Sequence, residues 1–277
     1  MKIVLSRKGF DAKNGGVPSP ILEDGTLVSL PIPSNTGISY DQIQAKDCHF
    51  GKLVSDLTKG KIRETAQAHL DPDLNPASVR REINWRPLFG QTGAALTHLR
   101  EISKGDLFLF FGWFRQVKRN GDGKYGYMRS APHLHVLFGW MQVEQVWNCE
   151  GDEIPSWAQQ HPHVGGKYGS VFVASEWLDN SEISGGGTFR RFNESLCLTA
   201  PDHSRSIWRL PKWFYPFNSK AEREPLSYHK ERNNWKLNDD YVDLQTAKIG
   251  QEFILDVSNY PEAMDWAHKL ILVSQKN

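Results

Sequence analysis

Cysteine is scarce in this chain, which has three among its 277 residues: Cys48, Cys149 and Cys197. No two of them form a CxxC pair, which excludes a thiolate zinc ribbon and a thioredoxin-like redox site. A small, odd number of widely spaced cysteines is typical of proteins in a reducing compartment. We therefore expect a cytoplasmic protein.

The chain also lacks a long hydrophobic run. Its longest apolar stretch, residues 107–114, is interrupted by Gly112 and is far shorter than the roughly 20 residues that cross a bilayer as a helix. The apolar residues 3–5 are too few for the core of a secretory signal. The sequence thus predicts a soluble protein with no membrane partner.

Neither sign of charge dominates, because 33 Lys and Arg face 32 Asp and Glu. A net charge of +1 argues against a polycation that coats nucleic acid, but it permits a local basic surface. A hydrophobic content of 39% excludes a mainly disordered chain. Aromatic residues are abundant, with 10 Trp, 14 Phe and 8 Tyr, so we expect some of them to line a pocket or a stacking surface.

Strands outnumber helices in the pattern of apolar and turn residues. Apolar runs bounded by turn residues predict strands at 3–5, 27–32, 106–117, 124–128, 134–143 and 169–175. Capping and breaker residues predict helices at 40–44, 53–57, 75–81, 94–102 and from about 262 to 273. This pattern favours an α+β fold with a β-rich, partly closed barrel at its centre and peripheral helices.

No linker-like segment divides the chain, so we expect one domain over residues 1–277. Within it we expect a loop-rich N-terminal part at 1–104, the barrel-like core at 105–200, and a C-terminal extension at 201–277 that ends in a helix.

The first candidate site directly follows the first predicted strand. Ser6, Arg7 and Lys8 precede a glycine-rich turn, and adjacent cations with free backbone N–H groups can hold a phosphate. Asp11, in the same turn, can act as a general base or orient a sugar hydroxyl. A surface turn with solvated charges explains the same residues.

A second candidate lies in His69-Leu-Asp71-Pro-Asp73. An imidazole and two carboxylates this close can hold a divalent cation or divide acid and base roles between them. A turn followed by a helix cap explains the same pattern. Gln91 follows shortly after, and its amide can read a base edge, although a turn at a helix start accounts for it equally well.

Two His-x-His pairs, His133/His135 and His161/His163, raise the question of a metal. Residues i and i+2 of a strand share a face, so one pair can face one ion. Since no third ligand stands at a telling spacing, no metal site is predicted and no particular cofactor is indicated. We expect the first pair to line the mouth of the barrel and the second pair to lie in an exposed loop.

Basic and aromatic residues alternate in two segments, a combination that suits phosphates and stacked bases. The segments contribute the candidate nucleic-acid-binding residues Arg115, Lys118, Arg119, Arg209 and Lys212. The alternative is a core of aromatic side chains surrounded by cations whose stems pack on it.

Six segments carry a resemblance to a known family: the opening Met-Lys-Ile-Val-Leu-Ser-Arg-Lys-Gly-Phe-Asp, then 15–22, 24–33, 69–73, 89–94 and 105–115. They resemble the third nucleotide modification associated domain family. The resemblance implies a role beside enzymes that alter bases in DNA or nucleotides, often in phages or defence loci.

A second resemblance concerns the centre of the chain. Gly105-Asp106 before an apolar strand, followed by residues 135–143, is similar to the pattern of PUA-like and EVE-like barrels. Such barrels often bind modified bases or RNA, so this resemblance implies a PUA-like barrel as the core.

Together these features favour an enzyme that acts on a nucleotide or on a base in DNA or RNA. In this hypothesis Arg7 and Lys8 hold phosphate, and Asp11 or Asp71 is the general base with His69 as its partner. Gln91 then reads the base, and Tyr168 or an aromatic residue of the barrel stacks on it.

Two alternatives assign no catalysis. One is a reader that binds a modified base, and the other is a structural subunit of a modification or defence complex. All three hypotheses imply a nucleotide, a nucleic acid or partner modification enzymes as the ligand or partner.

Overall fold

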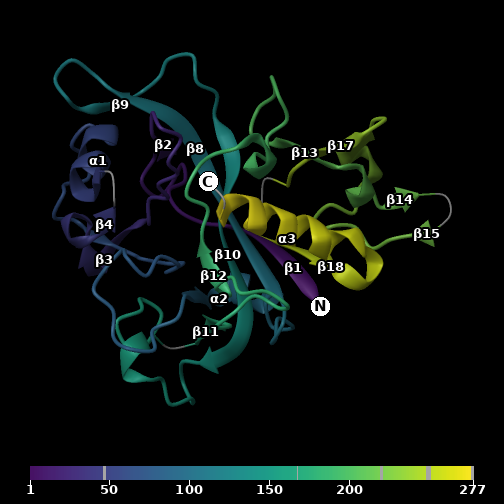
Figure 1. The fold of residues 1–277 in the computed structure, drawn as a ribbon, viewed down its shortest axis with the longest axis horizontal. Coiled ribbons are helices and arrows are strands. Elements are labelled where there is room, and N and C mark those ends of the chain that lie inside the picture. The colour runs from purple at the N-terminus through teal and green to yellow at the C-terminus, as the bar shows by residue number, and fades with distance from the viewer. Residues whose placement is uncertain (46–47, 167, 219–220, 248–250, 276–277) are drawn as a thin grey trace.

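The computed structural model describes residues 1–277 apart from 46–47, 167, 219–220, 248–250 and 276–277 (Figure 1). In the described part of the chain, nine strands join one large sheet. Its main order is β18 (Glu252–Asp256), β1 (Lys2–Arg7), β8 (Leu107–Arg119), β10 (Leu134–Asn148), β11 (Gly169–Ala174) and β7 (Leu88–Thr92). Three short strands join beside it: β2 (Ser19–Ile21) and β9 (Tyr125–Tyr127) pair with β8, and β12 (Gly186–Thr188) pairs with β10.

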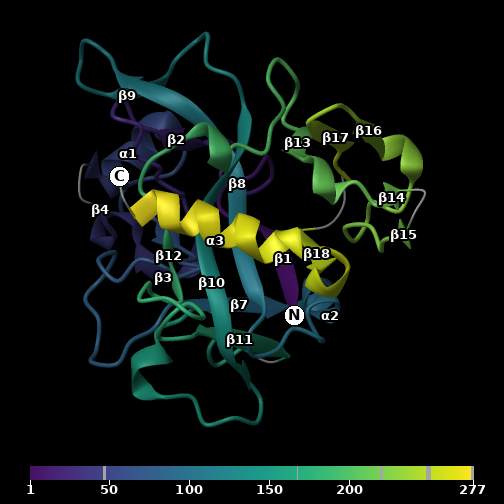
Figure 2. The ribbon, with the colours of Figure 1, turned by 45° about the vertical axis from the view of Figure 1, so that its right-hand side comes forward.

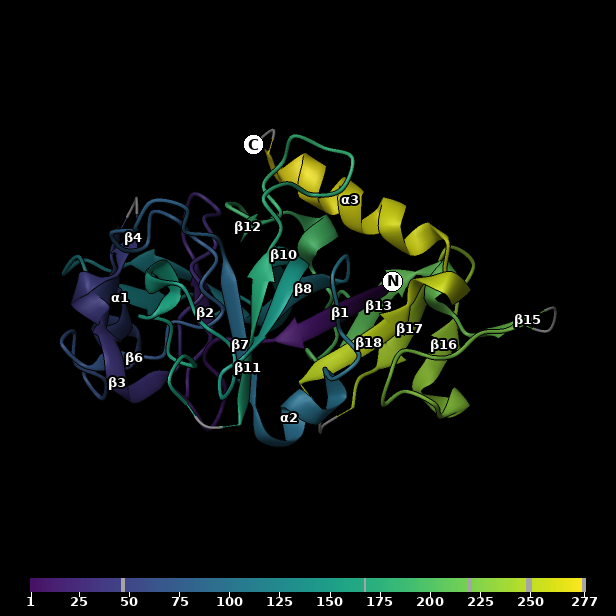
Figure 3. The ribbon, with the colours of Figure 1, turned by 90° about the horizontal axis from the view of Figure 1, so that it is seen from below.

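An N-terminal layer and a C-terminal sheet lie at opposite ends of the large sheet (Figures 1 and 3). The N-terminal layer comprises β3 (Pro33–Ser39), η1 (Tyr40–Gln42), β4 (Gln44–Ala45), β5 (Cys48–His49), α1 (Phe50–Leu57) and β6 (Gln67–Ala68). The C-terminal sheet has the order β13 (Ile207–Pro211), β17 (Tyr241–Gln245) and β16 (Trp235–Leu237), and β14 (Phe217–Asn218) pairs with β15 (Ala221–Glu222) nearby.

Two helices flank the large sheet. Helix α2 (Gly93–His98) directly follows β7, and α3 (Glu262–Gln275) crosses one face of the sheet (Figures 2 and 3). Ala263, Ala267 and Ile271 of α3 are buried in the main core, so the helix covers that face with an apolar stripe. None of the described helices is long and apolar enough to cross a membrane.

The apolar run of β8 is buried along both of its faces. Leu107, Phe108, Leu109, Phe110 and Phe111 are all fully buried, although successive side chains of a strand point to opposite faces. A strand whose two faces are both covered reads as a continuous hydrophobic run, which is the reason the sequence signal here was strong.

Most predicted elements are confirmed, with shifted ends. Strands form at five of the six predicted positions, and helices form at four of the five. The strand predicted at 27–32 is wrong because its backbone groups find other partners: Leu27 N–H donates to the carbonyl of Arg190, and Leu30 N–H donates to Ser19 Oγ. The helix predicted at 75–81 is also wrong, since the Arg81 guanidinium holds the segment in turns by donating to Asp73 and to the Asn75 carbonyl.

The strand-rich, mixed α and β class is confirmed, but the PUA-like barrel is not. Within the described residues the sheets form no closed barrel, because β18 and β7 end the main order and do not pair with each other. A twisted open sheet with covered faces produces the same apolar, glycine-containing strands as a small barrel, so the pattern alone does not separate them.

His135 of β10 is buried in the core and does not line a barrel mouth. Its Nδ1 accepts a hydrogen bond of 3.0 Å from Trp208 Nε1. Burial, with smaller contributions from Arg205 and Arg7, lowers the pKa of His135 to about 3.

This burial makes stability depend on pH. The unfolded chain binds a proton at His135 near pH 6.5 and the folded chain does so only near pH 3, so stability is lost as pH falls through that window. We expect protonation of His135 in the unfolded chain to lower the free energy of unfolding by about 2 to 3 kcal/mol between pH 7 and pH 4.5. Urea unfolding of wild type and His135→Asn, whose amide oxygen can replace Nδ1 as acceptor, measures this as a difference in pH slope. Equal slopes in the two proteins contradict the assignment.

Candidate functional site

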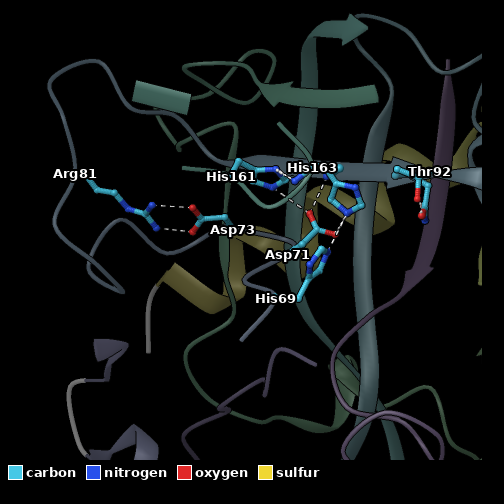
Figure 4. A network of polar contacts seen from close by, with 9 residues as sticks. His69, Asp71, Asp73, Arg81, Thr92, His161 and His163 are labelled. Atoms are coloured by element: carbon cyan, nitrogen blue, oxygen red, sulfur yellow. Dashed lines mark hydrogen bonds and ion pairs between the residues drawn. The ribbon is translucent and has the colours of Figure 1, made fainter. Parts of the chain in front are cut away.

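Four side chains from two distant segments meet at one place (Figure 4). His69 and Asp71 lie in the loop after β6, and His161 and His163 lie in the loop between β10 and β11. We call these four residues the His–Asp cluster. The cluster corrects the expectation that His161 and His163 lie in an exposed loop, because His161 is buried and His163 is mostly covered.

The edge strand β7 fixes the loop that carries Asp71. Asp73 and Leu88 exchange two backbone hydrogen bonds, of 2.8 and 2.9 Å. The N–H of Gly90 in the same strand donates to Asp71 Oδ1 over 2.7 Å. The carboxylate is therefore held by main chain from the sheet, which makes its position rigid.

Three imidazoles surround this carboxylate. His161 Nε2 lies 3.2 Å from Asp71 Oδ1, and His163 Nε2 lies 3.6 Å from Oδ2. His69 Nε2 lies 3.0 Å from His163 Nε2. The two Asp71 oxygens thus have different neighbours, with Oδ1 between Gly90 and His161 and Oδ2 on the side of His163.

Glycine is required at position 90 by the packing of His163. A Cβ placed on Gly90 would stand 2.4 Å from carbons of the His163 ring. Any larger residue there must displace this imidazole, which makes Gly90 part of the site although it has no side chain.

The surroundings of the cluster favour an ionised Asp71 beside neutral His69. Burial opposes ionisation of Asp71, but the nearby His161 and His163 outweigh it and hold the Asp71 pKa well below its usual range. Burial also lowers the pKa of His69, and the Asp71 charge only partly opposes this. The cluster therefore combines an anion with a neutral imidazole at neutral pH.

Asp73 has a structural partner of its own. Its carboxylate pairs with the Arg81 guanidinium, which also packs over the Trp85 ring at 4.1 Å from the centroid. Burial raises the pKa of Asp73, and the Arg81 hydrogen bond and charge oppose that shift. Of the two carboxylates in this segment, only Asp71 belongs to the His–Asp cluster.

A cavity of about 670 Å³ lies beside the cluster, and the segment from Leu70 to Asp73 forms part of its wall. Apolar residues from the N-terminal layer and the large sheet line much of the remainder, among them Leu22, Val28, Ile43, Phe50 and Phe138. Two exposed cations, Arg190 and Arg191, stand at the lining as well. The volume of this cavity lies in the range of small-molecule sites in proteins.

Lys8 and Gln91, predicted to bind phosphate and base, contact a buried carboxylate instead. Lys8 Nζ lies 2.8 Å and Gln91 Nε2 lies 2.9 Å from Glu252 Oε1. The Gln91 side-chain oxygen accepts from Thr92 N–H. Ser6, the third residue of this group, is fully buried in β1.

Arg7 and Asp11 lie at a different cavity from Asp71. They line a small cavity of about 130 Å³ together with His135 and Arg205. Asp11 Oδ1 accepts the N–H groups of Lys13 and Asn14, so the carboxylate organises the turn that contains it. The structure thus separates the two candidate bases, Asp11 and Asp71.

Tyr168, the predicted stacking residue, projects into solvent and is 73% exposed.

The candidate nucleic-acid-binding cations are of two kinds, those that contact a carbonyl or carboxylate group of the protein and those that lie exposed near the end of β8. Arg115 donates to the carbonyls of Ala131 and Met128, Arg209 pairs with Asp243, and Lys212 donates to the Asp239 carbonyl. Lys118 and Arg119 lie exposed near the end of β8, with Arg119 over the Tyr125 ring.

Sequence reasoning found the two halves of the cluster separately and did not join them. His161 and His163 lacked a visible third ligand because His69 lies 94 residues before His163. The signal that could have joined them is the pair of short motifs, His-Leu-Asp and His-Pro-His, each too polar for an ordinary core. Gly90 left no signal that distinguishes it from a turn glycine.

A family model described as nucleotide modification associated domain 3 matches residues 2–256. Searches among curated proteins and among solved structures found no match. The matched range includes β1 to β18 and every residue of the His–Asp cluster. The chain therefore belongs to the nucleotide modification associated domain 3 family.

Proposed function

We propose that this protein is an enzyme that modifies a nucleotide or a nucleic-acid base, with the His–Asp cluster as its catalytic centre. One observation carries the proposal: a buried carboxylate, contacted by His161 and His163, stands at the wall of a cavity of about 670 Å³. Perturbed titratable groups at a cavity are typical of active sites. The family name supports the nucleotide as substrate class.

The lining of the cavity suits a nucleotide. Leu22, Val28 and Phe138 supply an apolar wall for a flat base, and Arg190 and Arg191 supply cations for a phosphate. Within the described residues, Arg191 Nη2 stands 3.9 Å from the Asp24 carboxylate. A solvent-exposed ion pair at that distance is weak, so a phosphate can replace it.

The cluster supplies two kinds of chemical group. His69 supplies a neutral imidazole and Asp71 an anionic carboxylate, and both can bind a proton or a cation that takes part in the reaction. This assignment keeps Asp71 and His69 as the reactive pair and omits Asp11, which lines the other cavity.

Mass spectrometry of nucleosides tests the proposal. DNA, RNA and free nucleotides from cells that express the wild type are expected to contain a nucleoside of altered mass. In cells that express Asp71→Asn we expect this product to fall to about 1% or less, because losing one group that stabilises charge in the transition state costs about 10²–10³-fold. The mass difference identifies the transferred group, and the pool that contains it identifies the target.

Asp11→Asn is the matched control, because it makes the same change in a carboxylate that organises a surface turn. It is expected to leave the product unchanged. Loss of product in Asp11→Asn with full activity in Asp71→Asn would move the catalytic centre to the other cavity. Tight nucleotide binding without any altered nucleoside would instead identify a reader.

A further inference from the structure

We propose that His69, Asp71 and His163 bind one divalent transition-metal ion. The inference deepens the proposed function, on which the catalytic meaning of the ion rests, but metal binding itself is measured without any substrate. The three donor atoms come from separate positions of the fold and all lie within 4.8 Å of one another.

Two of the three separations between the donor atoms are close to those of one coordination sphere. Metal–nitrogen bonds of about 2.0–2.1 Å place neighbouring ligand atoms about 3 to 3.4 Å apart. His69 Nε2 and His163 Nε2 are 3.0 Å apart, and His163 Nε2 and Asp71 Oδ2 are 3.6 Å apart. The third separation, between the His69 and Asp71 donor atoms, is at most 4.8 Å, so side-chain shifts that bring these two atoms together complete the site.

The two carboxylate oxygens of Asp71 have different roles in the proposed site: the protein orients one of them, and the other binds the ion. Oδ1 accepts from Gly90 N–H, and His161 Nε2 lies 3.2 Å from it, so the protein itself orients this oxygen. Oδ2 is left on the side of His163. Metal-binding carboxylates are commonly fixed in this way by groups in the outer shell.

His161 gives an independent indication that a group is bound here. Its side chain is 1% exposed, and its Nε2 makes no hydrogen bond of acceptable geometry although it points at Asp71. Its Nδ1 accepts from His163 N–H over 3.4 Å. We infer that His161 positions Asp71 when the ion draws the carboxylate into place.

The donor set selects the class of ion. Two imidazole nitrogens and one carboxylate oxygen suit Zn²⁺, Fe²⁺, Co²⁺ or Ni²⁺, whereas Mg²⁺ and Ca²⁺ prefer oxygen ligands alone. Three protein ligands also leave positions open for water or substrate, which is the arrangement of catalytic metal sites.

Titration of chelator-treated, full-length protein with CoCl₂, followed by its visible spectrum and by calorimetry, tests the inference. We expect one equivalent to bind, with Zn²⁺ displacing Co²⁺ and a large excess of Mg²⁺ leaving the spectrum unchanged. His69→Gln, Asp71→Asn and His163→Gln should each weaken Co²⁺ binding at least about 100-fold, since even outer-shell partners contribute 10–100-fold. His203→Gln, a change in an exposed histidine elsewhere, should leave binding unchanged.

Gly90→Ala is a second variant that keeps every ligand and displaces the His163 ring. We expect it to weaken Co²⁺ binding about 10- to 100-fold. Gly126→Ala is its matched control, because a Cβ at Gly126 meets no atom within 4 Å. Unfolding curves of all variants show whether the fold is retained.

Absence of stoichiometric Co²⁺ and Zn²⁺ binding by the wild type overturns the inference, as does binding that persists in all three ligand variants. The proposed function fails separately. Metal binding without an altered nucleoside leaves the site in place, and nucleoside modification by chelator-treated protein leaves the function in place without the ion.

Discussion

Replacing Lys8 with methionine is expected to destabilise the protein by about 3 to 5 kcal/mol. The Glu252 side chain is 1% exposed and Lys8 is 9% exposed, with 2.8 Å between Lys8 Nζ and Glu252 Oε1. Removing the cation leaves a buried carboxylate whose remaining contact at Oε1 is the Gln91 amide. Urea unfolding at pH 7 measures the loss.

A double-mutant cycle separates the ion pair from the packing of the lysine stem. Lys8→Met combined with Glu252→Gln removes both charges, and the new amide oxygen can still accept from Gln91. We expect the double variant to recover most of the loss, because the cost comes from an unpaired buried charge. A loss below about 1 kcal/mol in Lys8→Met would place Lys8 among solvated surface cations, which is the alternative to phosphate binding given in the sequence analysis.

Phe89→Ala is expected to cost about 3 to 5 kcal/mol. Phe89 is fully buried, and its ring centroid lies 5.0 Å from that of Phe108, 5.3 Å from that of Phe110 and 5.6 Å from that of Phe172. Alanine would leave a cavity at the junction of β7, β8 and β11, because rings held in three strands cannot collapse into it freely.

Phe89→Leu is the matched control, since it keeps an apolar side chain and most of the volume. We expect it to cost less than half as much as the alanine variant in the same unfolding experiment. Equal losses would show that ring-to-ring contacts, and not the cavity, account for the stability that Phe89 provides.

Sequence patterns predicted best those helices and strands whose apolar and capping residues lie within the element itself. The run Leu107–Phe111 and the capped helix after Pro261 each contain their own evidence, and both are found in the structure. The segment 27–32 also contains four aliphatic residues, beside Ser29 and Pro31. Its backbone partners are Arg190 and Ser19, which no local pattern indicates.

The sequence revealed the two motifs of the candidate site but not their proximity, because their contact depends on residues far apart in the chain. His69 and Asp71 attract notice as one motif and His161 and His163 as another, but pairing of β11 with β7 is what brings the second motif to the first. The positive charge of Lys8 likewise did not show whether it binds phosphate or forms a buried ion pair. Its partner Glu252 lies 244 residues further along the chain, so a cation suited to phosphate and one neutralised in the core look alike in sequence.

The position of β1 in the large sheet affects how the chain folds during its synthesis on the ribosome. Strand β1 is synthesised before both of its neighbours: β8 on one side and β18 on the other, where Lys2 pairs with Asp256. Until residues 252–256 have left the ribosome, one edge of the apolar strand that contains Ile3, Val4 and Leu5 has no pairing partner. Such an edge is a template for pairing with other chains, so we expect nascent or C-terminally truncated protein to aggregate more readily than the whole chain.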